Sequence, residues 1–180
     1  KINSVVFDKT GTLTEGEFGI TDLVAIKRPE DELLAIAYSV ELNSEHPIAK
    51  GIVKEGKKRN LARREVHHYQ NLTGMGLQAS IDDQDIMIVG PRYVKDHQIE
   101  FDEDHYEALA QQGKTVIFIL EGNKLIGYIA LSDIIRETAK EAVDTLRSMG
   151  IESIMLTGDN QRVASYVGEK LNMDTIIAEV

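Results

Sequence analysis

An aspartate with the chemistry of a nucleophile stands near the start of the chain. Asp8 opens the string Asp-Lys-Thr-Gly-Thr-Leu-Thr and directly follows the apolar run Val5–Phe7, so its carboxylate lies where a buried strand meets a turn. An aspartate can accept a phosphoryl group from a nucleotide when a metal ion and hydrogen-bond donors neutralise the phosphate oxygens. Thr10, Thr12 and the backbone around Gly11 are suitable donors. The pattern indicates phosphoryl transfer to Asp8.

The residue two places after Asp8 bears on the fate of the acyl phosphate. Many aspartyl-phosphate hydrolases carry a second carboxylate there, which protonates the leaving group and activates water. Here the position holds Thr10. We therefore expect slow hydrolysis, which suits an enzyme that stores energy in the intermediate better than it suits a phosphatase. The alternative makes Asp8 a turn carboxylate and Thr10–Thr14 an ordinary polar loop.

A second group of residues has the chemistry to bind a nucleotide base. Glu41 precedes the string Ser-Glu-His-Pro that contains His46, and Gly74 and Gly76 follow as a Gly-x-Gly pair. An imidazole at a helix start can pack on a purine, a carboxylate can accept a hydrogen bond from the adenine amino group, and glycines let a backbone approach closely. Taken alone, a histidine such as His46 is more often an N-terminal helix cap or a surface residue, and a lone Gly-x-Gly is a weak signal.

A third group consists of Thr157, Gly158 and Asp159, which follow the apolar stretch 152–156. In a parallel sheet their hydroxyl and backbone N–H groups face the same end as Asp8, where ligands usually bind in such folds. These residues are therefore candidates for holding a phosphate.

The three groups, in this order, resemble the motifs of heavy-metal-transporting P-type ATPases of type IB. The string at Asp8 resembles the phosphorylation motif, Ser-Glu-His-Pro resembles the histidine-proline motif of the nucleotide-binding domain, and Thr-Gly-Asp resembles a motif that holds phosphate and ATP. The resemblance implies that the catalytic residues are Asp8, Lys9, Thr10, Thr157, Gly158 and Asp159. It implies ATP and Mg²⁺ as cofactors, the metal being held by Asp8 and Thr10. It implies that the nucleotide is bound by Glu41, His46, Gly74, Gly76 and Gly90.

The string Val-Gly-Pro-Arg-Tyr-Val-Lys at 89–95 departs from the family's common Val-Gly-Asn form and looks like the B-type copper or silver transporters. Any contact made by the missing asparagine is lost, whereas Gly90 can still approach a nucleotide through its backbone. We expect a region of a copper-exporting pump, at the cytoplasmic face of a membrane, with transmembrane and actuator domains of the same parent chain as partners. The alternatives are a soluble HAD-type (haloacid dehalogenase-type) phosphatase and a non-catalytic nucleotide-binding module.

Composition sets wider bounds. The chain has 180 residues, of which 42% are hydrophobic, enough for one large or two small domains. A net charge of -10 argues against nucleic-acid binding, and the lack of cysteine excludes disulfides and thiolate metal sites within these residues, as is natural inside a cell. No signal-peptide pattern opens the sequence, and no apolar run reaches the roughly 18 residues needed to span a bilayer. We therefore expect a soluble segment that does not insert into the membrane.

The periodicity predicts an α/β fold in which one domain interrupts another. Strands are expected at 2–7, within 66–89, and at 115–120, 124–131, 152–156 and 175–178, and helices at 29–41, 47–60, 102–112, 136–149 and 162–171. Residues 8–27 are expected to form a polar, glycine-bearing loop. Strand and helix alternation at both ends predicts a parallel sheet in an α/β core. The resemblance to P-type ATPases implies that this core is a HAD-like Rossmannoid phosphorylation domain (1–22 and 124–180). The inserted α+β nucleotide-binding domain, with an antiparallel sheet, is expected at 23–123.

The resemblance also sets limits. Family members continue into a lysine and a Gly-Asp-Gly-x-Asn-Asp motif that complete the phosphate and Mg²⁺ sites, and neither is present, so we expect an incomplete phosphorylation domain. Asp133 and Arg136 are either near the nucleotide or a helix cap with an exposed arginine. The basic stretch 54–64 is either a solvated helix end or a patch that attracts ATP phosphates or docks a neighbouring domain. We expect the histidines to be solvent-exposed, with the neighbours His67 and His68 pointing opposite ways along a strand.

Overall fold

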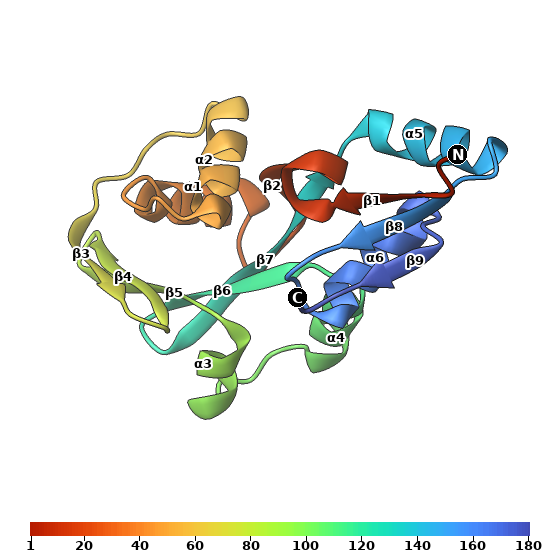
Figure 1. Cartoon of the computed structure of the whole chain (residues 1–180). Coiled ribbons are helices and arrows are strands. Elements are labelled where there is room, and N and C mark those ends of the chain that lie inside the picture. Colours follow the sequence, from red (N-terminus) through yellow and green to blue (C-terminus); the bar gives the residue numbers. More distant parts are fainter. The chain divides into compact units, whose positions relative to one another are not determined.

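The computed structural model describes all residues from Lys1 to Val180 and divides the chain into two compact units. The first unit comprises Lys1–Glu17, Glu107–Lys114 and Asp133–Val180, and the second comprises Phe18–Tyr106 and Thr115–Ser132. The chain therefore crosses between the units at 17/18, 106/107, 114/115 and 132/133, whereas the sequence predicted only two crossings, at 22/23 and 123/124. The α/β class with an inserted antiparallel domain is confirmed (Figure 1).

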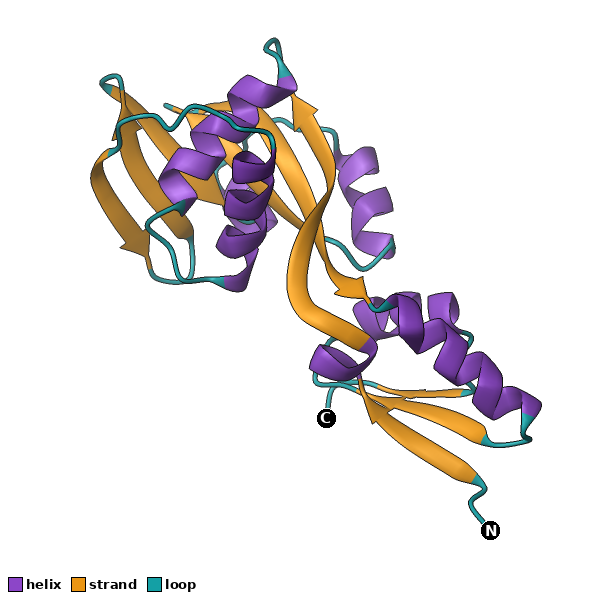
Figure 2. Ribbon diagram, turned by 90° about the horizontal axis from the view of Figure 1, so that it is seen from above, coloured by secondary structure: helices purple, strands orange, loops and turns teal.

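The first unit is built on a parallel sheet in the order β1-β8-β9. The strands are β1 (Ser4–Asp8), β8 (Glu152–Leu156) and β9 (Thr175–Ile177), and the helices α5 (Glu137–Ser148) and α6 (Gln161–Leu171) pack on one face of the sheet (Figure 2). The core beneath them contains Leu13, Ala139, Met155, Ala164, Val167 and Leu171. A wide turn, η1 (Lys9–Leu13), follows β1 directly.

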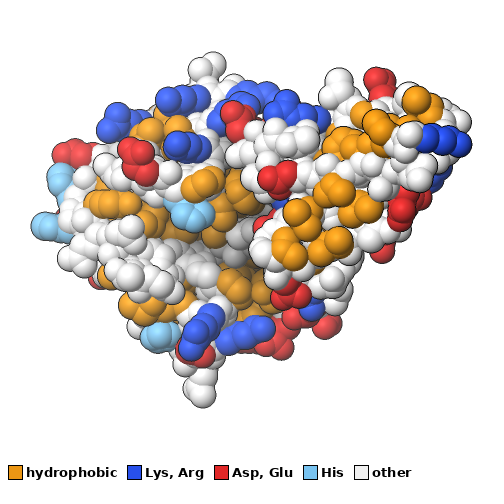
Figure 3. Space-filling view, viewed as in Figure 1, with side chains coloured by type: hydrophobic (Ala, Val, Ile, Leu, Met, Phe, Trp, Pro, Cys, Tyr) orange, Lys and Arg blue, Asp and Glu red, His pale blue; other side chains and the backbone are white.

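The opposite face of this sheet is open. Val6, Leu156 and Ile177 are 59%, 37% and 42% exposed, and the pairing of Leu156 with Ile177 sets their side chains on the same face. Figure 3 shows apolar side chains over this part of the molecule. Parallel sheets are usually covered on both faces, whereas this sheet is covered only on the face where α5 and α6 pack.

The segment Glu107–Lys114 belongs with the first unit, although the sequence placed it in the inserted domain. It holds the end of α4 (Glu103–Gln111) and the turn that follows. Gly113 packs closely against Val163 and Tyr166 of α6, and Arg162 lies 3.8 Å from the Glu107 carboxylate. These contacts between residues distant in sequence have no local signature.

The second unit carries a sheet in the order β2-β7-β6-β5-β4-β3, antiparallel from β7 to β3. Its strands are β2 (Thr14–Ala25), β3 (His67–Leu72), β4 (Gly76–Ile81), β5 (Gln84–Val89), β6 (Thr115–Glu121) and β7 (Lys124–Ile135). Its helices are α1 (Glu30–Glu41), α2 (Pro47–Lys58), α3 (Pro91–Asp96) and the start of α4. Both β2 and β7 continue into the first unit.

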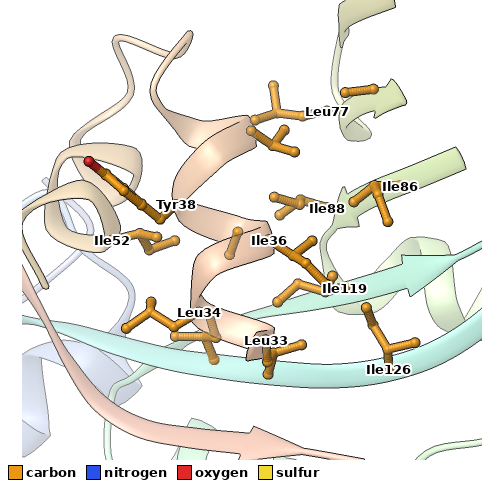
Figure 4. Packing of buried hydrophobic residues seen from close by; sticks show 14 of the residues in the cluster. Leu33, Leu34, Ile36, Tyr38, Ile52, Leu77, Ile86, Ile88, Ile119 and Ile126 are labelled. Atoms are coloured by element: carbon orange, nitrogen blue, oxygen red, sulfur yellow. The ribbon is translucent and has the colours of Figure 1, made fainter. Parts of the chain in front are cut away.

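Helix α1 lies against the sheet and supplies the centre of the second unit's core. Its side chains Leu33, Leu34 and Ile36 pack with Ile88 and Ile119 of the sheet (Figure 4). Three acidic residues in the first turn of α1 suit the helix dipole. None of the helices of the chain combines the length and the apolar composition needed to cross a bilayer.

Two elements differ from the sequence prediction. Residues 14–25, expected as part of a polar loop, form the strand β2, because Phe18, Ile20 and Leu23 pack against the core from the edge of the sheet. The glycines and glutamates of this stretch interrupt the apolar residues, so the sequence does not show the alternation expected of a strand. The short helix α3 was not predicted, because six residues are too few for a helical period to stand out.

Ile52 tests the contact between α2 and α1, because its side chain is 0% exposed within this core. Ile52→Ala should lower the free energy of unfolding of the second unit by about 3 kcal/mol, since it removes buried methyl groups and leaves a cavity. Urea denaturation followed by far-UV circular dichroism measures the change. The control Ile2→Ala, at a side chain that is 69% exposed, should change stability by less than about 0.5 kcal/mol.

Candidate functional site

The parallel pairing of β1 with β8 places two of the predicted residue groups at one edge of the first unit's sheet. Asp8 lies opposite Leu156, so the next residue, Thr157, stands at the same carboxyl end. The Asp8 side chain is exposed, whereas Thr157 is buried. Asp8 is the last residue of β1, and the other five residues that the sequence nominated for catalysis lie in the turns that follow these two strands: Lys9, Thr10, Thr157, Gly158 and Asp159.

Lys9 is held between two carboxylates. Its Nζ lies 2.5 Å from Asp159 Oδ2 and 3.7 Å from Asp133 Oδ2, and its side chain is only 4% exposed. A buried ammonium is costly unless it is paired, and here the pairs are formed within the first unit. Lys9 therefore ties the turn after β1 to the turn after β8.

Asp133 and Arg136 hold the loop that follows Asp8. The Asp133 carboxylate accepts hydrogen bonds from Thr14 Oγ1 at 2.7 Å and from the Gly16 amide at 3.1 Å. The Arg136 guanidinium donates to the carbonyl oxygens of Thr14 and Gly11, each at 3.1 Å. The helix-cap reading of Asp133 is wrong, because the N-cap position of α5 is Arg136 and no side chain caps that end.

Two backbone amides of the turn after β8 hold it in place, one through a side-chain hydroxyl and one through β9. The Asp159 amide donates to Thr157 Oγ1 at 3.1 Å, and the Thr157 amide donates to the Ile177 carbonyl at 3.0 Å. Asn160 then caps α6, its side chain accepting from the Val163 amide at 3.0 Å. The Thr157 hydroxyl is therefore held in place at the sheet edge that carries Asp8.

The second unit contains a cavity of about 360 Å³. All five residues that the sequence nominated for nucleotide binding line it: Glu41, His46, Gly74, Gly76 and Gly90. The remaining wall is mostly apolar and consists of Ser44, Ile48, Ala49, Asn71, Leu72, Met75, Leu77, Ile88, Val89 and Ile117. Figure 3 shows the hollow on this face, bordered by apolar side chains. An apolar hollow with a few polar groups is the usual form of a small-molecule site.

Local structure explains how the lining residues reach the cavity. His46 is the N-cap residue of α2, where its Nδ1 accepts a hydrogen bond from the Ile48 amide at 3.2 Å, and Pro47 fills the first helical position. Gly76 has a φ of 138°, and a Cβ there would collide with the Ile88 carbonyl oxygen. Only glycine fits where β4 meets β5 at the cavity wall.

Glu41 is an unusual carboxyl group because it ends α1 in the interior. It is 4% exposed, and burial raises its pKa from 4.5 to about 7. Near neutral pH the group therefore exists in both protonation states. It can accept a hydrogen bond from a ligand amino group when ionised and donate one when protonated.

A neighbouring cavity of about 320 Å³ shares Gly74, Met75 and Gly90 with the first. Its other walls come from Arg92, Tyr93, Asp96 and His97 of the α3 region. The rings of Tyr93 and His97 are stacked with centroids 3.8 Å apart. Sequence reasoning missed these residues because it missed α3, although the spacing of four between Tyr93 and His97 is a helical signal.

The structure does not gather the other histidines into a site. His67, His68 and His97 are exposed as expected. His105 was also expected to be exposed but is half-buried, because its Nδ1 shares a 2.6 Å hydrogen bond with the Tyr128 hydroxyl. The expected alternation at His67 and His68 is interrupted, because His68 has a φ of 53° and the pairing with β4 shifts register there. No group of three or more histidine, cysteine, aspartate or glutamate side chains has the arrangement of a metal site.

Glu41 makes stability depend on pH in a defined direction. Its folded-state pKa of about 7 exceeds the ordinary value of 4.5, so folding favours the protonated form. The cost of burying the ionised group is absent below about pH 4.5 and grows to about 3 kcal/mol above pH 7. Glu41→Gln should therefore stabilise the second unit at pH 8 and leave it nearly unchanged at pH 4.5, as measured by urea denaturation. Equal effects at both pH values, or an equal gain from the exposed control Glu45→Gln, would contradict the assignment.

Asp133 should contribute strongly to the stability of the first unit. Asp133→Ala removes one carboxylate from the buried Lys9 and leaves the Thr14 hydroxyl and Gly16 amide without that acceptor, so we expect a loss of about 3 kcal/mol. Chemical denaturation of the first unit measures it. The control Asp144→Ala, exposed on α5, should have little effect, and a similarly small effect of Asp133→Ala would show that the clamp is unimportant.

Comparison with known proteins agrees with this architecture. The family model of haloacid dehalogenase-like hydrolases matches residues 2–180. The copper-exporting P-type ATPase B of Archaeoglobus fulgidus is 48% identical over 179 residues, which are 99% of this chain and 26% of that protein. The chain thus spans about a quarter of the length of that relative.

Solved structures show the same fold. A zinc-transporting PIB-type ATPase in the E2.Pi state matches all of this chain with 29% of its own length, at a TM-score of 0.93 and 30% identity. The catalytic domain of the CPx-ATPase CopB-B, in a structure describing conformational changes upon nucleotide binding, matches 99% of this chain with 62% of its own, at a TM-score of 0.71 and 27% identity. The chain therefore belongs to the haloacid dehalogenase-like hydrolases and is a homologue of the heavy-metal P-type ATPases.

Proposed function

We propose that this chain is the ATP-binding and aspartyl-phosphorylation region of a heavy-metal-transporting P-type ATPase. The observation that carries the proposal is the second unit's cavity, which is lined by all five residues nominated for ATP from the sequence. The second unit is the nucleotide-binding domain, and the first unit is the phosphorylation domain. The sequence relatives favour copper as the transported ion of the parent protein, at the cytoplasmic face of its membrane.

The cavity suits an adenine base. Its apolar wall, including Leu77 and Ile88, can enclose the ring, and the buried Glu41 carboxyl can accept a hydrogen bond from the amino group. His46 supplies an imidazole at the rim, where it can orient the base. Gly76 has no side chain, so its backbone can lie close to the nucleotide. The site therefore recognises the base chiefly by shape and by one polar edge.

The first unit suits the acceptance of a phosphoryl group. Asp8 is exposed at the end of β1, so its carboxylate oxygen is free to attack the terminal phosphorus of ATP; a bond to that oxygen forms as the bond to the departing ADP oxygen breaks. The Thr157 hydroxyl and the amides of the following turn stand at the same sheet edge and can hold the transferred group.

Mg²⁺ fits this donor set. It usually takes one or two carboxylates and keeps waters and phosphate oxygens as its other ligands, so the Asp8 carboxylate and an oxygen of Thr10 would hold it with the substrate. When bound, it neutralises charge on the transferring phosphate. The position two residues after Asp8 holds threonine, so the side chain there has no carboxylate to activate water, which favours the pump over a soluble phosphatase.

Calorimetric titration with ATP, with and without Mg²⁺, tests the proposal. Glu41→Ala and His46→Gln should each weaken binding at least about fivefold, since each removes a polar contact with the base. Asp8→Asn, in the other unit, should leave the affinity unchanged and should abolish phosphorylation of the full-length parent. Binding indifferent to the Glu41 and His46 changes would move the nucleotide out of this cavity and overturn the assignment.

A further inference from the structure

Six of the eight arginines of the chain have a side-chain partner within the protein. Five pair with carboxylates and the sixth donates to two carbonyl oxygens, in the order Arg28, Arg59, Arg92, Arg147, Arg162 and Arg136. The side chains of Arg63 and Arg64 make no hydrogen bond or ion pair. The chain carries 30 acidic residues, so carboxylates are not scarce. The two unpaired guanidinium groups are therefore unusual, and they are adjacent.

Both unpaired arginines line the same cavity of the second unit. Its volume is about 340 Å³, and its wall consists of Ser39, Asn43, Arg63, Arg64, Glu65 and Val66. Five of these six residues are polar or charged, whereas the wall of the cavity proposed for ATP is mostly apolar. A planar base would find little apolar surface here. An anion suits the cavity better, because each guanidinium group carries five N–H donors and a permanent positive charge.

The segment that carries the two arginines is held in place by the core. Leu61 and Val66, on either side of them, pack against the core of the second unit. Between these anchors the Arg64 amide donates to Ser39 Oγ at 2.9 Å, and this buried hydroxyl of α1 donates to the Ala35 carbonyl at 2.7 Å. The backbone between α2 and β3 is thereby tied to α1 at the cavity wall. A fixed backbone lowers the entropy that is lost when a ligand binds.

The fold accounts for most of the other cations near this cavity. Lys57 and Lys58 stand in the last turn of α2, where positive charge suits the helix dipole. Arg59 lies 3.0 Å from the carboxylates of both Asp31 and Glu55. Figure 3 shows Lys and Arg side chains gathered over α2, so the cavity lies in a region of positive potential. A solvated helix end explains these residues and leaves the two unpaired arginines unexplained.

We propose that this cavity is an anion site, in which Arg63 and Arg64 bind a phosphate group. Guanidinium groups donate paired hydrogen bonds to phosphate oxygens, and two of them balance the charge of a phosphate dianion. Asn43 adds an amide to the wall. Glu65 opposes an anion, but its carboxylate is 83% exposed and lies 3.1 Å from His67 Nε2. The cavity shares no lining residue with the one proposed for ATP, so the inference does not rest on the proposed function.

NMR titration of the whole chain with inorganic pyrophosphate tests the proposal. The Nε–H resonances of Arg63 and Arg64 and the amides of residues 63–66 should shift and give a dissociation constant. Arg63→Gln and Arg64→Gln should each weaken binding about tenfold, because each removes charge-assisted hydrogen bonds. The matching lysine variants keep the charge but lose the planar fork, so their loss should be smaller. Glu65→Gln should tighten binding about twofold, because it removes a carboxylate from the wall.

Matched controls separate a built site from a diffuse positive field. Lys58→Gln removes one charge from the same surface, and Arg92→Gln removes an arginine that is 94% exposed on α3. Each should change the affinity for pyrophosphate by less than about twofold, because salt screens exposed charges that do not touch the ligand. An equal loss in Lys58→Gln and Arg64→Gln would reduce the effect to the net charge and overturn the proposal. Resonances of residues 63–66 that pyrophosphate leaves unmoved would do the same.

Titrations with inorganic phosphate and with ATP identify the source of the phosphate group. Shifts of residues 63–66 that ATP produces in Glu41→Ala as well as in the wild type mean that the site accepts the phosphates of a nucleotide. Shifts produced by phosphate and pyrophosphate alone restrict the ligand to the free ions. Arg64→Gln should leave the ATP-induced shifts of Gly74 and Gly76 unchanged. If that variant weakens them, the arginines belong to the ATP site and the separate anion site is overturned.

Discussion

The first unit depends on the burial of one positive charge. The Lys9 ammonium cannot be left unpaired in the interior, so the carboxylates of Asp133 and Asp159 must come to it. Asp133 then has two oxygens to satisfy, and it draws in the hydroxyl of Thr14 and the amide of Gly16. Three stretches far apart in the sequence are thereby fixed around the exposed Asp8. The Asp8 side chain stays exposed, and its neighbour Lys9 makes the ion pairs that hold this region together.

The second unit also buries an ionisable group, in this case a carboxyl group in a mostly apolar wall. Glu41 ends α1 among hydrophobic side chains, and burial raises the pKa of its carboxyl group. At high pH the ionised Glu41 carboxylate lowers the stability of the second unit. Groups whose pKa is shifted by burial cluster at functional sites, which agrees with the proposed role of Glu41.

Much of this arrangement could be predicted from the sequence, because its signals are local. Helices α1, α2, α5 and α6 carry apolar periods and start signals, and the strings at Asp8, His46 and Thr157 are short and distinctive. The edge strand β2 could not be predicted, because glycine and glutamate interrupt its apolar residues. Those residues become buried only when β2 pairs with β7 in the sheet. The contacts of Asp133 could not be predicted either, because Lys9, Thr14 and Gly16 are distant from it along the chain. In each case the sequence does not show which distant residue is the contact partner.

The open face of the β1-β8-β9 sheet governs how the isolated polypeptide behaves in solution. Val6, Leu156 and Ile177 form an exposed apolar surface that favours association between copies, whereas a net charge of -10 opposes it. Salt screens that repulsion, and sulfate or phosphate strengthens apolar association. Colloidal stability is therefore greatest at low ionic strength, and kosmotropic salts are the natural precipitants for crystallising the chain.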